Sequence, residues 1–161
     1  SNNYKTNISA KVTHEDLASF SSTSGSLPTT KKGEGATIYS TVYWSQVNID
    51  GKPHFQVDAV SSRWELDSSF LILSGEKVII AQNGPSRTGS AFITQKNTIY
   101  YDESNYVSVS SNYDWVPVID ATNSIVGARD EAQLSHVNGG ESWTVELINA
   151  KIFNYPTGLP F

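Results

Sequence analysis

Along most of the chain after residue 35, hydrophobic side chains alternate with polar ones. In residues 54–60, for example, Phe55 and Val57 alternate with Gln56 and Asp58, which is the pattern of a β-strand with one buried face. A helix would instead repeat its apolar positions every three to four residues. The pattern therefore predicts strands over residues 36–49, 54–60, 63–67, 90–95, 98–102, 105–110, 114–120 and 142–153.

Turn residues separate these segments. Asp50-Gly51 is expected to form a tight hairpin turn, because both residues tolerate the positive φ that such turns require. The apolar runs 70–73 and 78–81 are joined by Ser74-Gly75-Glu76, which predicts a second hairpin, buried on both faces. A loop is expected over residues 83–89.

The last third of the chain is less regular. Pro117 cannot donate a hydrogen bond to a neighbouring strand, so segment 114–120 is expected at a sheet edge or at a bulge. Residues 121–141 have the weakest pattern, with one helical turn expected over residues 130–134 and a tight turn at Asn138-Gly139-Gly140. Strands follow one another without helices of ordinary length, which predicts an antiparallel β-sandwich, with a β-barrel as the alternative.

The N-terminal part has a different composition. Residues 19–35 are rich in Ser, Thr and Gly and offer little apolar surface to bury, which is typical of linkers. Thr13 and the acids after it predict a helical turn over residues 14–19. We therefore expect a flexible arm over residues 1–35 and a single β-sandwich domain over residues 36–161.

Charge and cysteine content narrow the classes of function. The 161-residue chain has a net charge of −5, so nucleic acid would repel it, and it contains no apolar run long enough for a transmembrane segment. The absence of Cys excludes disulfides, a thiolate nucleophile and Cys-ligated metal. The absence of Met and the high Ser, Thr and Asn content lead us to expect an extracellular or cell-surface protein whose signal peptide has been removed.

One stretch has a recognisable arrangement. The run Val60-Ser61-Ser62-Arg63-Trp64 is followed by a Ser-rich segment and then by Lys77-Val78 and Gln82-Asn83-Gly84. This arrangement, which covers about a third of the chain, resembles a pattern in uncharacterised secreted β-rich proteins of Gram-positive bacteria. The resemblance implies a bacterial, secreted setting. It implies no activity.

Catalytic signatures are weak. The three histidines, His14, His54 and His136, have no nucleophile elbow beside them, and no zinc-binding spacing occurs. Glu65 and Asp67 could form the carboxylate pair of a glycosidase, but they alternate with apolar residues as the solvent face of a strand does. We therefore expect no enzyme activity and no cofactor.

Calcium is the one cation with candidate ligands. They lie in two acidic groups, neither of which has the spacing of an EF-hand calcium-binding loop. The first group comprises Asp102, Glu103, Ser104 and Asn105, and the second comprises Asp120, Asn123 and Asp130.

The strongest positive signal is a cluster of aromatic residues interleaved with acids and amides. Such surfaces bind sugar rings and protein partners, because Tyr and Trp offer large rigid contact areas. Strand alternation sends consecutive tyrosines to opposite faces, so only some members can be exposed. Trp44, Trp64 and Trp143 are assigned to the core instead. The candidate ligand-binding residues are Tyr100, Tyr101, Tyr106, Tyr113 and Trp115.

The preferred hypothesis is thus a non-enzymatic extracellular domain that contacts a surface, a protein or a glycan. One alternative is a small carbohydrate-active or other hydrolytic enzyme. The second is a toxin-like or membrane-active β-protein, in which Ser- and Thr-rich hairpins leave the body of the domain.

Overall fold

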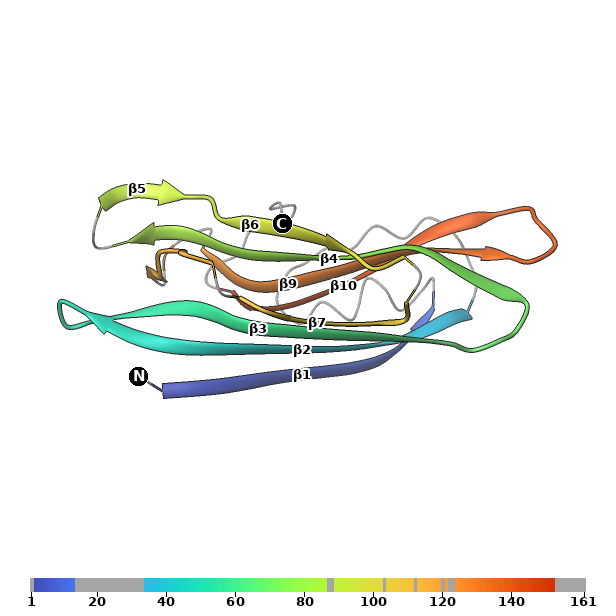
Figure 1. The fold of residues 1–161 in the computed structure, drawn as a ribbon, viewed down its shortest axis with the longest axis horizontal. Helices are drawn as coiled ribbons and strands as arrows, with labels where there is room; N and C mark the ends of the chain where they lie inside the picture. The colour runs from blue at the N-terminus through green and yellow to red at the C-terminus, as the bar shows by residue number, and fades with distance from the viewer. Residues whose placement is uncertain are drawn as a thin grey trace.

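The structure is a computed structural model, and it describes residues 2–13, 34–86, 89–102, 104–111, 113–119, 121 and 124–152. All regular structure in this part of the chain is β-strand, arranged along one long axis (Figure 1). No helix among these residues is long and apolar enough to cross a membrane. The strands are β1 Asn2–Thr13, β2 Glu34–Ile49, β3 Lys52–Leu66, β4 Leu71–Ser86, β5 Gly89–Ile93, β6 Lys96–Tyr100, β7 Tyr106–Ser110, β8 Val118–Ile119, β9 Ile125–His136 and β10 Ser142–Ile152.

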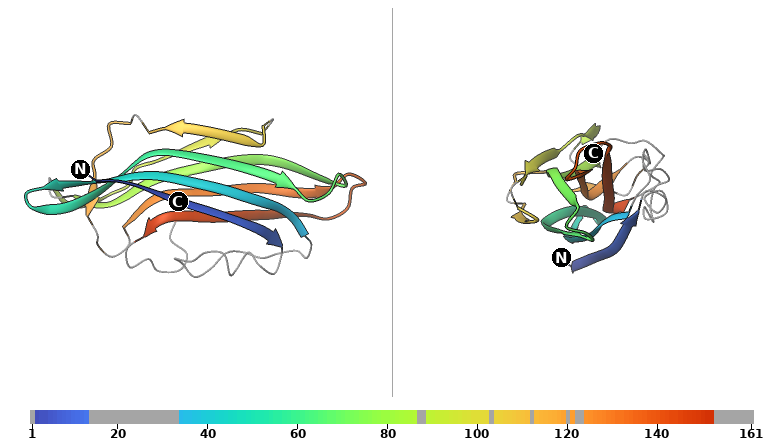
Figure 2. Two further views of the ribbon diagram at one scale, coloured as in Figure 1. Left: turned by 90° about the horizontal axis from the view of Figure 1, so that it is seen from below. Right: turned by 90° about the vertical axis from the view of Figure 1, so that its right-hand side faces the viewer.

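The strands form two antiparallel sheets that lie face to face (Figure 2). Sheet A has the order β1-β2-β3-β7, and β8 pairs with the same side of β3 as β7 does. Sheet B has the order β10-β9-β4-β5, and β6 also pairs with β4. No strand pairing joins the described strands of one sheet to those of the other, which confirms the β-sandwich and excludes the barrel alternative.

Alternation along the strands builds the core between the sheets. Ile38 and Val42 of β2 and Ala128 and Leu134 of β9 are all fully buried and belong to one hydrophobic core. Trp44, Trp64 and Trp143 are all buried, as the sequence predicts. Burial of these side chains stabilises the sandwich by about 2–3 kcal/mol for each large residue.

The turn between β2 and β3 is the predicted hairpin. Asp50 and Gly51 both have positive φ, 51° and 76°, and Ile49 pairs with Lys52 across a two-residue turn. These angles suit a type I′ turn, whose twist matches that of the flanking strands.

The predicted hairpin between runs 70–73 and 78–81 is wrong. Residues 71–73 and 78–81 both belong to β4, which also includes residues 83–86 of the expected loop. Gly75, with φ of 64°, lies at a β-bulge where the register against β9 shifts between Ser74 and Lys77. A glycine that permits positive φ can bend a strand without reversing it, so the sequence signal for a turn marks a bulge here.

The irregular segment expected over residues 121–141 is also wrong over most of its length. Residues 125–136 form β9, a strand between β10 and β4, and the helical turn expected over 130–134 is absent. A buried acid, Asp130, interrupts the apolar pattern that would otherwise have identified the strand. Of residues 114–119, only Val118 and Ile119 pair with a neighbouring strand, as β8, directly after Pro117.

Residues 2–13 of the expected arm form β1, which pairs with β2 along its whole length. The sequence there alternates Tyr4, Ile8, Ala10 and Val12 with polar residues, which is a strand pattern. Residues 14–33, which include the expected helical turn, lie outside the described residues.

Candidate functional site

The five candidate aromatics do not form a single cluster. Tyr100 ends β6 in sheet B and Tyr106 begins β7 in sheet A, so the connection 101–105 crosses from one sheet to the other between them. Their exposed fractions are 66% and 54%. Tyr113 and Trp115 follow β7 and are half-buried, with ring centroids 4.5 Å apart.

Tyr101 differs from its neighbour because it points into the core, with only 8% of its surface exposed. Its hydroxyl accepts a hydrogen bond from Nε1 of Trp64 at 2.8 Å and donates one to Oδ1 of Asp130 at 3.3 Å. Burial raises its pKa above the range of ordinary tyrosines. The hydroxyl of Tyr101 is therefore engaged in hydrogen bonds inside the core and is not open to a ligand. Tyr100 is exposed, which confirms the prediction that the two consecutive tyrosines point to opposite faces.

Asp130 is fully buried beside Tyr101. Burial raises its pKa to about 7, although the hydrogen bond from Tyr101 favours the charged form. Glu76, in the bulge of β4, is also buried, and burial raises its pKa as well. The interior near Tyr101 thus holds two acids whose pKa values are raised by burial.

Around the β6–β7 connection lies a hollow of about 430 Å³ lined by Tyr100, Tyr101, Asp102 and Ser104, which we call the turn hollow. The Ser104 amide donates to the carbonyl of Tyr101 at 2.9 Å, which closes the turn, and the Ser104 hydroxyl donates to the carbonyl of Tyr106. The ammonium group of Lys77, on neighbouring β4, lies 6.0 Å from the centre of the Tyr100 ring. The hollow therefore combines an exposed ring, a carboxylate and a short, hydrogen-bonded turn.

A second group lies on the outer face of sheet A. Arg63 stands over the ring of Tyr39 at 3.9 Å and forms an ion pair with Glu65, which also accepts a hydrogen bond from the Tyr39 hydroxyl. Tyr106 is the register partner of Arg63 on β7, so Tyr39, Arg63 and Tyr106 form a row across three strands. Contact with the aromatic ring and the ion pair together hold the guanidinium in place.

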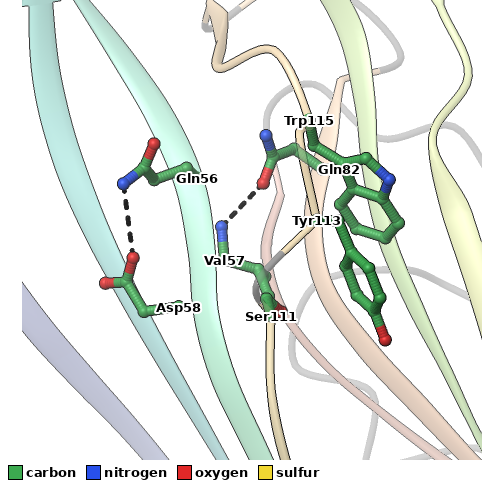
Figure 3. A pocket seen from close by; sticks show the side chains of 7 residues that line it. All are labelled: Gln56, Val57, Asp58, Gln82, Ser111, Tyr113 and Trp115. Atoms are coloured by element: carbon green, nitrogen blue, oxygen red, sulfur yellow. Dashed lines mark hydrogen bonds between the residues drawn. The ribbon is translucent and has the colours of Figure 1, made fainter.

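Tyr113 and Trp115 line a separate, smaller hollow at the edge of β3 (Figure 3). Two buried or half-buried glutamines brace the segment that carries them. Gln82 accepts a hydrogen bond from the Val57 amide at 2.8 Å and donates to the carbonyl of Val116 at 2.9 Å. Gln95 accepts from the Val116 amide at 2.6 Å and donates to the Val116 carbonyl at 2.8 Å.

The candidate calcium ligands are dispersed. Asp102, Ser104 and Asn105 lie in the β6–β7 connection, whereas Asp130 lies in the middle of β9, buried in the core. Glu103, Asp120 and Asn123 lie outside the described residues. Among the residues that the structure describes, no three His, Asp or Glu side chains are grouped so as to hold a metal ion.

The candidate catalytic residues are engaged elsewhere. His54 is fully buried and its Nδ1 lies 3.0 Å from the carbonyl oxygen of Lys52, while His136 packs against Trp143. Glu65 is exposed and paired with Arg63. His14 lies outside the described residues.

Sequence reasoning missed the Tyr39–Arg63 contact and the two glutamines. A signal for the first existed, because Tyr39 and Arg63 both occupy polar-side positions of strands joined by the predicted Asp50-Gly51 hairpin. No local signal marks Gln82 and Gln95, since their partners are 13 to 34 residues away along the chain.

No protein-family model matches this chain, and searches of curated proteins and of solved structures found no significant match.

Proposed function

We propose that this chain is a non-enzymatic, extracellular binding domain that contacts a glycan through the turn hollow. The observation that carries the proposal is the placement of Tyr100, which projects a largely exposed ring beside the carboxylate of Asp102 on a hydrogen-bonded turn. A sugar presents apolar C–H groups on its faces and hydroxyls around its edge, so an aromatic ring next to hydrogen-bond acceptors suits it.

The rigidity of the support favours this assignment. Tyr101, adjacent to Tyr100, is held in the core by Trp64 and Asp130, so the exposed ring emerges from a fixed backbone. The amide of Tyr101 also donates to the carbonyl of Glu76 on β4 at 2.9 Å. A preorganised surface binds with a smaller loss of conformational entropy than a mobile one.

The non-enzymatic part of the proposal is supported by the positions of the candidate catalytic groups. Nδ1 of buried His54 donates to the carbonyl of Lys52 in its own strand, and the Glu65 carboxylate is occupied by Arg63 and Tyr39. The extracellular setting is supported by the Cys-free, hydroxyl-rich composition and by the resemblance to secreted bacterial proteins.

A glycan array probed with the full chain tests the proposal. We expect binding to a subset of glycans, and we expect Tyr100→Ala to weaken it about tenfold or more, which corresponds to about 1.4 kcal/mol. Tyr43→Ala is the matched control, because Tyr43 is also an exposed tyrosine but lies on β2, outside the turn hollow. Absence of binding to every glycan, or equal losses in the two variants, would contradict the proposal.

A second candidate function, contact with a protein, is favoured by the row of Tyr39, Arg63 and Tyr106 on the outer face of sheet A. Tyr and Arg are the residue types that contribute most to protein–protein binding. If this function is the correct one, a partner isolated by cross-linking should be lost with Arg63→Ala and retained with Tyr100→Ala.

A further inference from the structure

The turn hollow contains a charged group that the fold leaves open to a ligand. Tyr100 and Asp102 lie two residues apart at the end of β6, and both line the hollow, whereas Tyr101 between them points into the core. The side chain of Asp102 is exposed, and its carboxylate forms no hydrogen bond or ion pair with the described residues. A ligand can therefore reach this carboxylate without displacing a protein group.

The hydrogen-bonding groups of the wall are mostly acceptors. The carboxylate of Asp102 accepts hydrogen bonds and donates none. The Ser104 hydroxyl donates its single proton to the carbonyl of Tyr106 at 2.9 Å and accepts from the Tyr106 amide at 3.2 Å, so it can offer a ligand only a lone pair. The hydroxyl of Tyr101 is engaged in the core. We therefore expect a ligand that brings hydrogen-bond donors.

The charges around the turn hollow favour a cation. No Lys or Arg lines the hollow in the described part of the chain. A second acid lies close by, because the carbonyl of Glu76 on β4 accepts from the Tyr101 amide at 2.9 Å. The Glu76 side chain is buried, and its Oε1 has no hydrogen-bond partner among the described residues. Burial raises the pKa of Glu76, and the negative charge of Asp102 raises it further.

The exposed ring of Tyr100 provides a second attraction for a cation. An aromatic ring attracts a cation that lies over its face within about 6 Å of the ring centre. The Lys77 ammonium lies at the limit of this range, at 6.0 Å, and it is paired with the carboxylate of Glu131 at 3.7 Å. Because 66% of the surface of Tyr100 is exposed, the ring has area for a ligand as well.

We propose that the turn hollow selects an amino sugar with a free, protonated amine, which places its ammonium group beside Asp102 and Ser104 and its ring against Tyr100. The inference rests on the proposed glycan-binding function and adds the class of sugar. An ammonium group supplies both the positive charge and the three donors that the wall lacks. An N-acetylated sugar has a neutral amide at the same place and loses the charge interaction. The volume of about 430 Å³ lies within the range of small-ligand sites.

Nuclear magnetic resonance titration of the full chain with matched oligosaccharides tests the class of sugar. The probes are the chitosan tetramer, which carries free amines, the fully N-acetylated tetramer with the same linkages, and tetralysine as a cationic peptide. We expect the chitosan tetramer to shift the backbone amides of Tyr100, Asp102 and Ser104. It should bind about tenfold more tightly than the N-acetylated tetramer, as expected for one exposed ion pair and one cation–π contact.

Matched aspartate variants identify the contact. Asp102→Asn removes the charge and keeps the shape, so it should reduce the preference for the amine form from about tenfold to about twofold. Its affinity for the N-acetylated tetramer should not change. Asp114→Asn, at an exposed position outside the turn hollow, should keep the full preference. Tyr100→Ala should weaken the binding of both tetramers.

The salt dependence of the wild type gives a measurement that does not depend on the folding of a variant. Salt screens interactions between exposed charges, so the preference for the amine form should fall as sodium chloride is added. A preference that stays constant with added salt would contradict the ion pair with Asp102.

Three further results would overturn the inference and leave the proposed glycan binding intact. The first is equal or tighter binding of the N-acetylated tetramer. The second is binding of tetralysine as tightly as the chitosan tetramer, because the charge alone would then be recognised. The third is an equal effect of Asp102→Asn and Asp114→Asn. If neither tetramer nor any glycan of the array binds, the proposed function itself is wrong, and the inference is wrong with it.

Discussion

Replacing Asp130 by Asn should remove a large part of the pH dependence of stability. Asp130 is fully buried, and burial raises its pKa from 3.8 to about 7, a difference of about three pH units. One unit corresponds to about 1.4 kcal/mol, so ionised Asp130 destabilises the folded state by about 4 kcal/mol relative to its protonated form.

The folded state should lose stability as the pH rises, because burial raises the pKa of Asp130. An acid whose pKa is higher in the folded state contributes its full stability below the unfolded value, near pH 4. That contribution is then lost as the pH rises through 7. Between pH 5 and pH 8 the wild type should lose about 2–3 kcal/mol that Asp130→Asn keeps. The variant also keeps an oxygen to accept the hydrogen bond from Tyr101.

Urea unfolding of both proteins at pH 5, 6, 7 and 8 measures this difference. Other acids with raised pKa values, Glu76 and Glu146, are present in both proteins, so their contributions cancel in the comparison. Parallel stability curves for wild type and variant would show that Asp130 does not titrate in this range and would refute the reasoning.

Two further substitutions probe packing and bracing, both measured by urea unfolding. Gly127→Ala should destabilise the protein by about 2–3 kcal/mol, because the added Cβ would lie 2.4 Å from Cα of Ala150 on β10. A change below about 0.5 kcal/mol would contradict the close approach of β9 and β10. Gln82→Leu should cost about 1–3 kcal/mol, because it leaves the amide of Val57 without its partner, whereas Gln95 still serves the carbonyl of Val116. Unchanged stability of Gln82→Leu would contradict the structural role of the hydrogen bond between Gln82 and the Val57 amide.

The fold class could be predicted from the sequence because alternation and turn chemistry are local. The Asp50-Gly51 turn and strands such as β2, β7 and β10 follow from residues within each segment. The same local signals failed at Gly75, where positive φ serves a bulge within β4. A glycine in such a conformation indicates a bend, and only the pairing with β9 shows that the chain does not reverse.

The error at β9 has a different cause. Asp130 lies at an inward position, and a charged residue there breaks the pattern on which strand prediction depends. Its hydrogen-bond partner Tyr101 lies 29 residues away along the chain, so nothing near Asp130 in the sequence indicates that it is buried.

Alternation of side chains along a strand predicts which of the candidate aromatic residues are exposed, but it does not predict how they are grouped. Alternation separates Tyr100 from Tyr101 and places Tyr106 opposite Val107, as the structure confirms. It does not predict that Tyr113 and Trp115 pair with each other over an unpaired stretch of β3, because that depends on the contacts of Gln82 and Gln95.

Thermal melting of five alanine variants most directly tests the central claim that one part of the aromatic set is exposed for binding and another supports the core. Removal of buried Tyr101 should cost about 3–5 kcal/mol, and removal of exposed Tyr100 or Tyr106 should change stability by no more than about 0.5 kcal/mol. Half-buried Tyr113 and Trp115 should lie between these limits. Five strongly destabilised variants would contradict the claim, because all five rings would then belong to the core and none would be available for a ligand.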